Sequence, residues 1–378
     1  MMQSRRTKLL NWRQPNRLSL VAAAAALLAA ATVGQASEPA GGLATGTAGV
    51  AGASVASVAY VSLRGGDPQI WVQNSQGREQ VLTQGKSLYA QPALASDGRL
   101  AYVARETGRP VVYTMNGDGS AQQRVSAGTD AEMAPSWSPD GRSLAFFALD
   151  LQSGKSVLRL VNLQTKASAT LAGPSLSMGP APASWSADGK RLCFLGQDAK
   201  GRTQAFVVQH DGSGLKELSS KFAPRGAAWA ELSPDGKNVV WVADLREKRS
   251  HLIVTDVDTA QSTDLTADVV ASHESPRWSA DSQYLVFSST RDDPAGTRTD
   301  IHTMKFDGSE LRNLSHHPAE DFDPKWSSDG RHIIFASLRS GTSLLYQVDL
   351  QGNKTEALAQ HASHDMEHSV RPVALLAR

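Results

Sequence analysis

Histidines and carboxylates gather in three stretches in the last third of the chain, and their side chains could bind a metal ion. The stretches are 265–276, 314–324 and 358–372. They hold six of the ten histidines, and the candidate binding residues are His273, His316, His317, Asp321, His361, His364, Asp365 and His368. Neutral imidazoles combined with carboxylates suit zinc, iron or manganese. A divalent metal is therefore the first cofactor to consider.

The same residues have a second interpretation, a polar surface of solvated loops. None of the spacings between the histidines matches a known metal-ligand signature, which favours this second interpretation. Both interpretations place the side chains on loops at one face of a rigid scaffold, where functional groups commonly lie. We therefore predict a binding surface at that face, expect no cofactor, and keep a divalent metal as the alternative.

Arginines recur at equivalent places and could recognise carboxylates. Arg64, Arg105, Arg291 and Arg339 each follow a short apolar strand, on the face that has the histidines. A planar guanidinium binds a carboxylate through two parallel hydrogen bonds. Arg291 and Arg339 are thus candidates for recognising carboxylates of a partner or of an acidic sugar. The alternative, which we favour, is ion pairing between repeats or a role in the turns.

A repeated hairpin must position all of these side chains. Its turn occurs seven times, at spacings of 42 to 49 residues. The seven turns are Gln76-Gly77, Asp118-Gly119, Gln164-Thr165, Asp211-Gly212, Asp258-Thr259, Asp307-Gly308 and Gln351-Gly352. Repeats of this length with short β-rich flanks are typical of the blades of a β-propeller. The pattern predicts an all-β fold of four-stranded antiparallel blades.

A second motif, an apolar residue followed by Ser-x-Asp-Gly, occurs six times in phase with the first, with Ala95 in place of the serine in the first copy. Four copies begin with tryptophan, at Trp137, Trp185, Trp278 and Trp326. The Asp-Gly pair predicts a tight turn, because glycine readily adopts the left-handed backbone conformation. Ser282 replaces this glycine in the fifth copy, which predicts strain or a different turn. The tryptophans should pack between blades and not bind a ligand.

The difference between seven hairpins and six Asp-Gly turns indicates how the ring closes. The first unit, from Val58, has no inner strand before it, and the chain ends in the apolar segment Val370 to Leu376. Pro372 aligns with Pro276 and Pro324, which each lie two residues before a tryptophan. We therefore predict that Val370 to Leu376 pairs with the first unit and removes the open sheet edges. This favours seven blades, with six as the alternative.

These repeats resemble the TolB-like propeller repeat, from about residue 55 to the end of the chain. The best local matches are Ala134 to Gly141, which has the sequence Ala-Pro-Ser-Trp-Ser-Pro-Asp-Gly, and Asp300 to Met304 with Asp307-Gly308. The Gly-His and Trp-Asp dipeptides of Trp-Asp repeats are absent. TolB itself has an α/β domain before a propeller of six blades, so the resemblance concerns the propeller part.

The resemblance implies a non-enzymatic scaffold that binds an envelope protein. The sequence has no Gly-x-Ser-x-Gly elbow, phosphate loop, dinucleotide motif or paired-histidine zinc helix, which argues against the enzyme classes that need them. The alternative is a metal-dependent polysaccharide lyase of the oligogalacturonate type. Such lyases have similar propellers with manganese held by histidines, and the loop histidines would be the ligands here.

The N-terminal 36 residues have the pattern of a signal peptide. Five basic residues precede an apolar run from Leu18 to Val33, and Gly34-Gln35-Ala36 offers the small residues that a signal peptidase recognises. We predict cleavage after about Ala36, a periplasmic location and no stable membrane span, because the run is short. Residues 37–54 are rich in Gly, Ala, Ser and Thr and predict a flexible linker. The propeller then occupies residues 55–378.

Composition limits the possible partners. Removal of residues 1–36 leaves 33 basic against 37 acidic side chains, and no basic run is interleaved with aromatic residues. We therefore expect no nucleic acid partner, and we expect a monomer. The single cysteine, Cys193, lies within a predicted strand and should be a buried, inert thiol.

Overall fold

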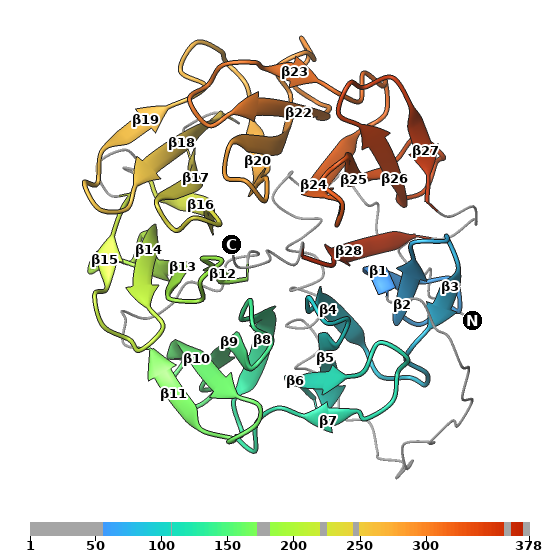
Figure 1. The fold of residues 1–378 in the computed structure, drawn as a ribbon, viewed down its shortest axis with the longest axis vertical. Coiled ribbons are helices and arrows are strands. Elements are labelled where there is room, and N and C mark those ends of the chain that lie inside the picture. The colour runs from blue at the N-terminus through green and yellow to red at the C-terminus, as the bar shows by residue number, and fades with distance from the viewer. Residues whose placement is uncertain are drawn as a thin grey trace, which may run out of the picture.

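The computed structural model describes residues 56–106, 108–171, 182–219, 225–244, 249–358 and 364–372. These residues form seven four-stranded antiparallel sheets arranged as blades around a central axis (Figure 1). The prediction of seven blades is confirmed, and the alternative of six is wrong. In the described residues the only regular elements are strands, so none of them forms a helix that could cross a membrane.

Each blade has an inner strand next to the axis, two middle strands and an outer strand. Blade 1 contains β28 (Asp365–Val370), β1 (Ala56–Ser62), β2 (Gln69–Asn74) and β3 (Glu79–Val81). Blade 2 contains β4 (Tyr89–Leu94), β5 (Leu100–Glu106), β6 (Arg109–Met115) and β7 (Gln123–Arg124). Blade 3 contains β8 (Ala131–Trp137), β9 (Ser143–Leu149), β10 (Ser156–Asn162) and β11 (Ser168–Leu171).

The remaining four blades repeat this order. Blade 4 contains β12 (Ser184–Trp185), β13 (Arg191–Gln197), β14 (Thr203–Gln209) and β15 (Lys216–Glu217). Blade 5 contains β16 (Ala227–Leu232), β17 (Asn238–Asp244), β18 (Ser250–Asp256) and β19 (Ser262–Asp264). Blade 6 contains β20 (His273–Trp278), β21 (Tyr284–Ser289), β22 (Asp300–Lys305) and β23 (Arg312–Asn313). Blade 7 contains β24 (Asp321–Trp326), β25 (His332–Ser337), β26 (Leu344–Asp349) and β27 (Thr355–Ala357).

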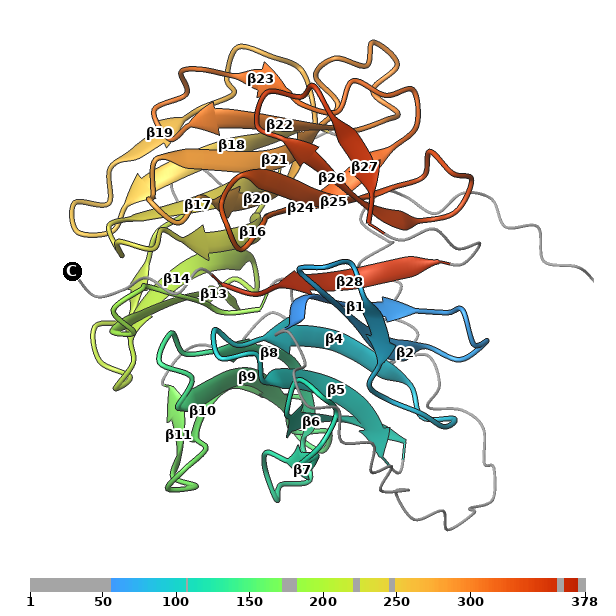
Figure 2. The same cartoon turned by 45° about the vertical axis from the view of Figure 1, so that its right-hand side comes forward.

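The C-terminal part of the chain closes the ring, as predicted, but with a different segment. Strand β28 lies beside β1 (Figure 2), with Val58 opposite Val370 and Ser62 opposite Asp365. The described strand that pairs with β1 is therefore 365–370. Of the predicted segment Val370 to Leu376, only Val370 belongs to this strand, and residues 373–376 lie outside the described residues. The alignment through Pro372 was wrong by four residues, because His368 and Val370 occupy the places that the proline and the tryptophan have in β8, β20 and β24. The hydrogen-bond register with β1 and the burial of its residues identify this strand, whereas the position of one proline does not.

The hydrophobic core lies between neighbouring blades. Middle strand β9 is buried along nearly its whole length, which explains its continuous apolar sequence. Its Leu144 and Phe146 pack with Ala101 and Val103 of β5 in the adjacent blade. Trp137 belongs to the same cluster. Blades thus stabilise one another through apolar contacts across each gap.

The turns have the predicted geometry. Gly98 and Gly141 have positive φ angles of 87° and 67° after their aspartates. Ser282 has a φ of 61°, so it adopts the glycine conformation with a side chain present. Its Oγ accepts a hydrogen bond of 3.1 Å from the backbone N–H of Asp235 in the preceding blade. This contact offsets part of the backbone strain.

The inner strands share a β-bulge that the sequence analysis did not predict. A residue with positive φ lies three positions before the last residue of six inner strands, and these residues are Gln91, Ala134, Trp229, Ser275, Asp323 and Glu367. The pairing register with the next strand shifts at the same place. A bulge bends a strand and re-aims its side chains. Five of these six residues line the central channel.

Candidate binding site in the central channel

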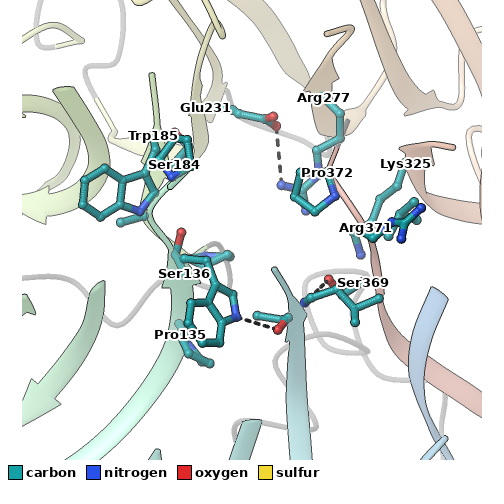
Figure 3. Close-up of a pocket in the computed structure, with 18 of the residues that line it drawn as sticks. Pro135, Ser136, Ser184, Trp185, Glu231, Arg277, Lys325, Ser369, Arg371 and Pro372 are labelled. Carbon is teal, nitrogen blue, oxygen red and sulfur yellow. Dashed lines mark hydrogen bonds and ion pairs between the residues drawn. The ribbon is translucent and has the colours of Figure 1, made fainter. Parts of the chain in front are cut away.

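A cavity of about 810 Å³ occupies the centre of the ring (Figure 3). It is lined by the later halves of the inner strands and by the turns that follow them. The residue before the last one in each inner strand contributes to the wall. These residues are Ala93, Ser136, Ser184, Glu231, Arg277, Lys325 and Ser369. One repeated position therefore determines much of the chemistry of the channel.

At the repeated position and at the bulges, charged residues come only from blades 5, 6, 7 and 1, although Asp140 in the turn after β8 also lines the cavity. Glu231, Arg277 and Lys325 come from blades 5, 6 and 7, and the bulge residues Asp323 and Glu367 come from blades 7 and 1. We call these five residues the charged arc. The other side has mainly small, polar or apolar residues. We call three of these, Met133, Pro135 and Trp185, the apolar wall. The cavity thus offers two different surfaces to one ligand.

The charged arc is a chain of contacts across blades. Lys325 Nζ lies 3.0 Å from Asp323 Oδ2 and also donates a hydrogen bond to the His368 carbonyl oxygen. Arg277 Nη1 lies 3.4 Å from Glu231 Oε2, and its Nη2 lies 3.9 Å from Asp323 Oδ1. The lysine is therefore closely paired, whereas the contacts of the arginine are long for hydrogen bonds.

The Arg277 guanidinium is held in place by an aromatic ring. Its central carbon lies 4.5 Å from the centre of the Trp229 ring, a distance at which cation–π attraction operates. Its Nε atom is buried and has no hydrogen-bond partner among the described residues. Arg277 is thus oriented by stacking while part of its hydrogen-bonding capacity is unused.

Burial shifts the ionisation of the arc. Burial raises the pKa of Glu231 and of Glu367, which favours their neutral forms. Burial also opposes the ionisation of Asp323, but Lys325, His368 and Arg277 outweigh this effect and lower its pKa to about 2. Burial lowers the pKa of Lys325. Asp323 is therefore the carboxylate of the arc that is most firmly ionised.

Side chains at the bulges link successive blades around the channel. The backbone N–H of Gln91 donates to Glu367 Oε2 at 2.7 Å, and the backbone N–H of Ala134 donates to Gln91 Oε1 at 2.8 Å. A bulge leaves a backbone N–H outside the sheet ladder, and a buried donor without a partner is costly. These contacts satisfy such donors and hold blades 1, 2 and 3 in register.

Comparison with known proteins places this ring in a family. A family model described as the TolB beta propeller domain matches residues 76–244 and 227–374. The chain belongs to this family. The match extends over six of the seven blades and into β28, so the resemblance seen in the repeats is confirmed.

Relatives within the family are distant. A protein named Protein TolB homolog from Chlorobium luteolum is 24% identical over 164 residues, which cover 43% of this chain and 35% of the relative. The Tol-Pal system protein TolB of Anaeromyxobacter dehalogenans is 29% identical over 122 residues, 32% of this chain and 27% of the relative. The chain thus spans about a third or less of the length of these curated relatives.

Solved structures show the same fold at low identity. TolB from Acinetobacter baumannii aligns with a TM-score of 0.53 and 16% identity over 81% of this chain and 79% of its own. An oligogalacturonate lyase from Vibrio parahaemolyticus aligns with a TM-score of 0.59 and 13% identity over 82% of this chain and 87% of its own. A puromycin hydrolase aligns with a TM-score of 0.62 and 14% identity over 82% of this chain and 53% of its own. These likenesses establish the propeller fold alone.

The structure places several predicted site residues in strands and not in loops. His273, Asp321 and Asp365 are the first residues of β20, β24 and β28, and all three are fully buried. A hydroxyl of the preceding blade donates to the backbone carbonyl of each one: Ser250 to His273 at 2.7 Å, Thr299 to Asp321 at 2.7 Å, and Ser343 to Asp365 at 2.8 Å. The loop assignment of these three residues is therefore wrong, because the inner strands begin earlier than predicted.

The other predicted histidines are dispersed. His316 and His364 are exposed, and His317 accepts a hydrogen bond at Nδ1 from the backbone N–H of Ala319. His361 lies outside the described residues. His368 lies in β28 and lines the channel, where its Nδ1 is 3.4 Å from Asp323 Oδ2. Across the described parts of the chain, no three His, Cys, Asp or Glu side chains come together as a metal site would require.

The two predicted arginines have different surroundings. Arg339 Nη2 contacts Asp321 Oδ2 at 2.9 Å, and its guanidinium lies 4.8 Å from the centre of the Tyr346 ring. This ion pair is within one blade, so Arg339 has a structural role. Arg291 is half-buried, and its side chain makes no ion pair or hydrogen bond within the described residues.

The cavity lies toward the other end of the inner strands from the predicted loops. Inner strands start at the histidine stretches and end at the Ser-x-Asp-Gly turns, and those turns line the cavity. The tryptophans before the turns pack between blades as predicted: Trp137 Nε1 donates to the Ala93 carbonyl at 2.9 Å and Trp278 Nε1 to the Glu231 carbonyl at 3.1 Å. The same rings also line the cavity.

The sequence held a signal for the charged arc that the analysis missed. The residue before the tryptophan or its equivalent is serine in blades 1, 3 and 4 but charged in blades 5, 6 and 7. A change from small to charged residues at one repeated position of a buried strand indicates a role beyond packing. Alignment of the repeats on this position would have identified Glu231, Arg277 and Lys325.

Proposed function

We propose that this protein is an exported, non-enzymatic scaffold of the cell envelope that binds a partner protein in its central channel. The main support is the channel itself, in which an apolar wall faces a charged arc in a cavity of about 810 Å³. Such a combination suits a protein segment that has both apolar and charged side chains. A relative of this chain is named as a protein of the Tol-Pal system, which favours an envelope protein as the partner.

The proposed location rests on the N-terminal sequence. Residues 1–36 have a basic start, an apolar run and a small-residue end, and they lie outside the described residues. Cleavage after about Ala36 would release the propeller, behind a linker of residues 37–54, into the periplasm. A single-chain ring with its own core requires no second copy to fold, so we propose a monomer.

A blocking substitution tests whether the channel is the partner site. Ser136 lines the cavity (Figure 3), and Ser136→Trp should fill it from blade 3. The matched control is Gln152→Trp, because Gln152 lies exposed in the turn between β9 and β10. Each purified variant is used to capture proteins from envelope extract, followed by mass spectrometry.

We expect wild type and the Gln152→Trp variant to retain one protein that the Ser136→Trp variant loses. Circular dichroism should show that both variants keep the melting temperature of the wild type. Equal capture by both variants would contradict the channel as the partner site.

The metal-dependent lyase stays an alternative proposal. A lyase of this fold is among the similar structures, but that likeness concerns the fold alone. The described residues bring no metal-binding group together, and His361 lies outside them. Elemental analysis of the purified mature protein separates the two proposals: the scaffold predicts less than about 0.1 equivalents of manganese, iron or zinc, whereas the lyase needs about one per chain.

A further inference from the structure

We infer that Arg277 selects a carboxylate-bearing side chain of the peptide segment that enters the channel. This inference rests on the proposed function and specifies the chemistry of the partner. Arg277 occupies the repeated channel position in blade 6 and faces the cavity between Glu231 and Lys325 (Figure 3).

The first argument is the unused capacity of this guanidinium. Arginine offers five N–H donors in a rigid plane that matches the two oxygens of a carboxylate. In Arg277 the two nearest carboxylate contacts, to Glu231 and Asp323, measure 3.4 and 3.9 Å. Good charge-assisted hydrogen bonds are about 2.7–2.9 Å long. The side chain is still 18% exposed, so an incoming carboxylate can form shorter bonds with the guanidinium than Glu231 and Asp323 do.

The second argument is pre-organisation. The guanidinium stacks on Trp229, which lies at a bulge with a φ of 75°. Stacking fixes the plane of the guanidinium before a ligand arrives, and less side-chain entropy is lost on binding. The only other cation of the arc, Lys325, is already paired with Asp323 at 3.0 Å. Arg277 is therefore the cation of the arc that is best prepared for a ligand.

The third argument is the gathering of basic side chains around Arg277. Arg277, Lys325 and Arg371 all line the cavity (Figure 3). Of the carboxyl groups that line it, which are Asp140, Glu231, Asp323 and Glu367, two already have close partners: Asp323 lies 3.0 Å from Lys325 Nζ, and Glu367 accepts a backbone hydrogen bond at 2.7 Å. A carboxylate added beside Arg277 is attracted by that guanidinium.

The apolar wall favours a peptide over a sugar as the source of the carboxylate. Pro135 and Trp185 lie across the cavity from Arg277 (Figure 3), and Met133 also lines the cavity. Leucine or aromatic side chains next to an acidic residue would bury against that wall, which stabilises the complex by the hydrophobic effect. A sugar acid has hydroxyl groups that this wall cannot satisfy.

The experiment compares two blocked tripeptides, in which a central glutamate or a central glutamine is flanked by leucines. Isothermal titration measures their affinity for the mature protein, and the Arg277 Nε–Hε signal in a nitrogen-15 NMR spectrum reports on contact. We expect the glutamate peptide to bind at least about tenfold more tightly, as a charge-assisted hydrogen bond would give. It should also shift the Arg277 signal.

Variants test the assignment to this residue. Arg277→Gln should remove the preference for glutamate, whereas Arg142→Gln, at an exposed arginine outside the cavity, should keep it. Glu231→Gln should strengthen binding of the glutamate peptide, because Glu231 competes for the same guanidinium. A gain of affinity cannot result from misfolding, so this variant keeps the test decisive if Arg277→Gln is unstable.

Three outcomes would overturn the inference. They are equal affinity for the two peptides, a glutamate preference that persists in Arg277→Gln, and tighter binding of a galacturonate trisaccharide than of the glutamate peptide. The last outcome would assign the carboxylate to an acidic sugar. If Ser136→Trp abolishes partner capture and Arg277→Gln does not, the channel remains the partner site and the carboxylate inference alone fails.

Discussion

At the scale of single residues, the histidines that could have bound metal include two that are buried and held neutral. Burial, with the charge of Arg291 nearby, lowers the pKa of His273 to about 3. Burial, with the charge of Lys325 nearby, also lowers the pKa of His368 to about 3. His273 packs edge-on against Phe287, with ring centres 5.8 Å apart. Each imidazole thus occupies a site that resists protonation.

These histidines should make the fold sensitive to acid. Their folded-state pKa lies below the unfolded value of 6.5, so the unfolded chain binds protons first as the pH falls. Stability is therefore complete above about pH 6.5 and decreases toward pH 3, by an amount on the order of a few kcal/mol for each histidine. Asp323, with its pKa of about 2, adds a further loss only below its unfolded value of 3.8.

Urea unfolding at pH 7.5 and 4.5 measures this effect. His273→Phe should reduce the difference in stability between the two pH values, and His316→Gln, at an exposed histidine, should leave it unchanged. An equal pH dependence in wild type and His273→Phe would show that His273 does not contribute.

Arg339 provides a second residue-scale prediction. Arg339→Ala removes the ion pair with the fully buried Asp321 and the contact with the Tyr346 ring. Loss of one partner of a buried pair leaves a costly charge, so we expect destabilisation by about 3 kcal/mol. Arg291→Ala is the control and should cost less than about 1 kcal/mol. Chemical denaturation of both variants tests this, and similar losses would argue against a structural role specific to Arg339.

At the scale of elements, the inner strand has two distinct ends. Its first residue is bound by the preceding blade, as Asp321 is by the Thr299 hydroxyl at 2.7 Å. Its later part, from the bulge onward, lines the cavity. A single strand therefore contributes to ring assembly at one end and to the candidate site at the other. The bulge between the two ends interrupts the alternation of side chains between the two faces of the strand.

Removal of strand β28 should open the ring. A chain that ends at His364 lacks the inner strand of blade 1, exposes the edge of β1 and loses the Gln91–Glu367 hydrogen bond. We expect a cost of several kcal/mol, comparable with the total stability of a domain. The comparison chain ends at Pro372 and retains β28. Thermal unfolding of the two chains tests this, and melting temperatures within a few degrees of each other would contradict closure by β28.

At the scale of the whole molecule, the ring combines rigidity with a central cavity. Seven blades share apolar contacts with their neighbours, and β28 joins the two ends of the described chain. Closure gives blade 1 its inner strand, so β1 is paired on both sides and the sheet edges that remain are short. The channel wall is thereby held in one arrangement, which suits recognition of a defined partner segment.

Export predicts a defined start for the mature protein. Expression of the full chain in a bacterial host, followed by fractionation and N-terminal sequencing, should give a periplasmic protein that begins near Ser37. Ala36→Leu should block cleavage, because the peptidase requires a small residue before the cut, and leave the protein with the membrane fraction. A full-length protein in the cytoplasmic fraction would contradict the predicted signal peptide.

The sequence by itself determined the fold class, the number of blades and the family. Tight turns leave clear local signals, because Asp-Gly pairs such as Asp140-Gly141 meet a backbone requirement that few residues satisfy. Only the tertiary structure decided the closing strand and the site. Strand β28 has neither the proline nor the tryptophan that β8, β20 and β24 have, so its identity depends on pairing with β1 across more than 300 residues. Repeat alignment can identify Glu231, Arg277 and Lys325, but Asp323 and Glu367 reach the channel at bulges, and a bulge is set by inter-strand register, which no local pattern encodes.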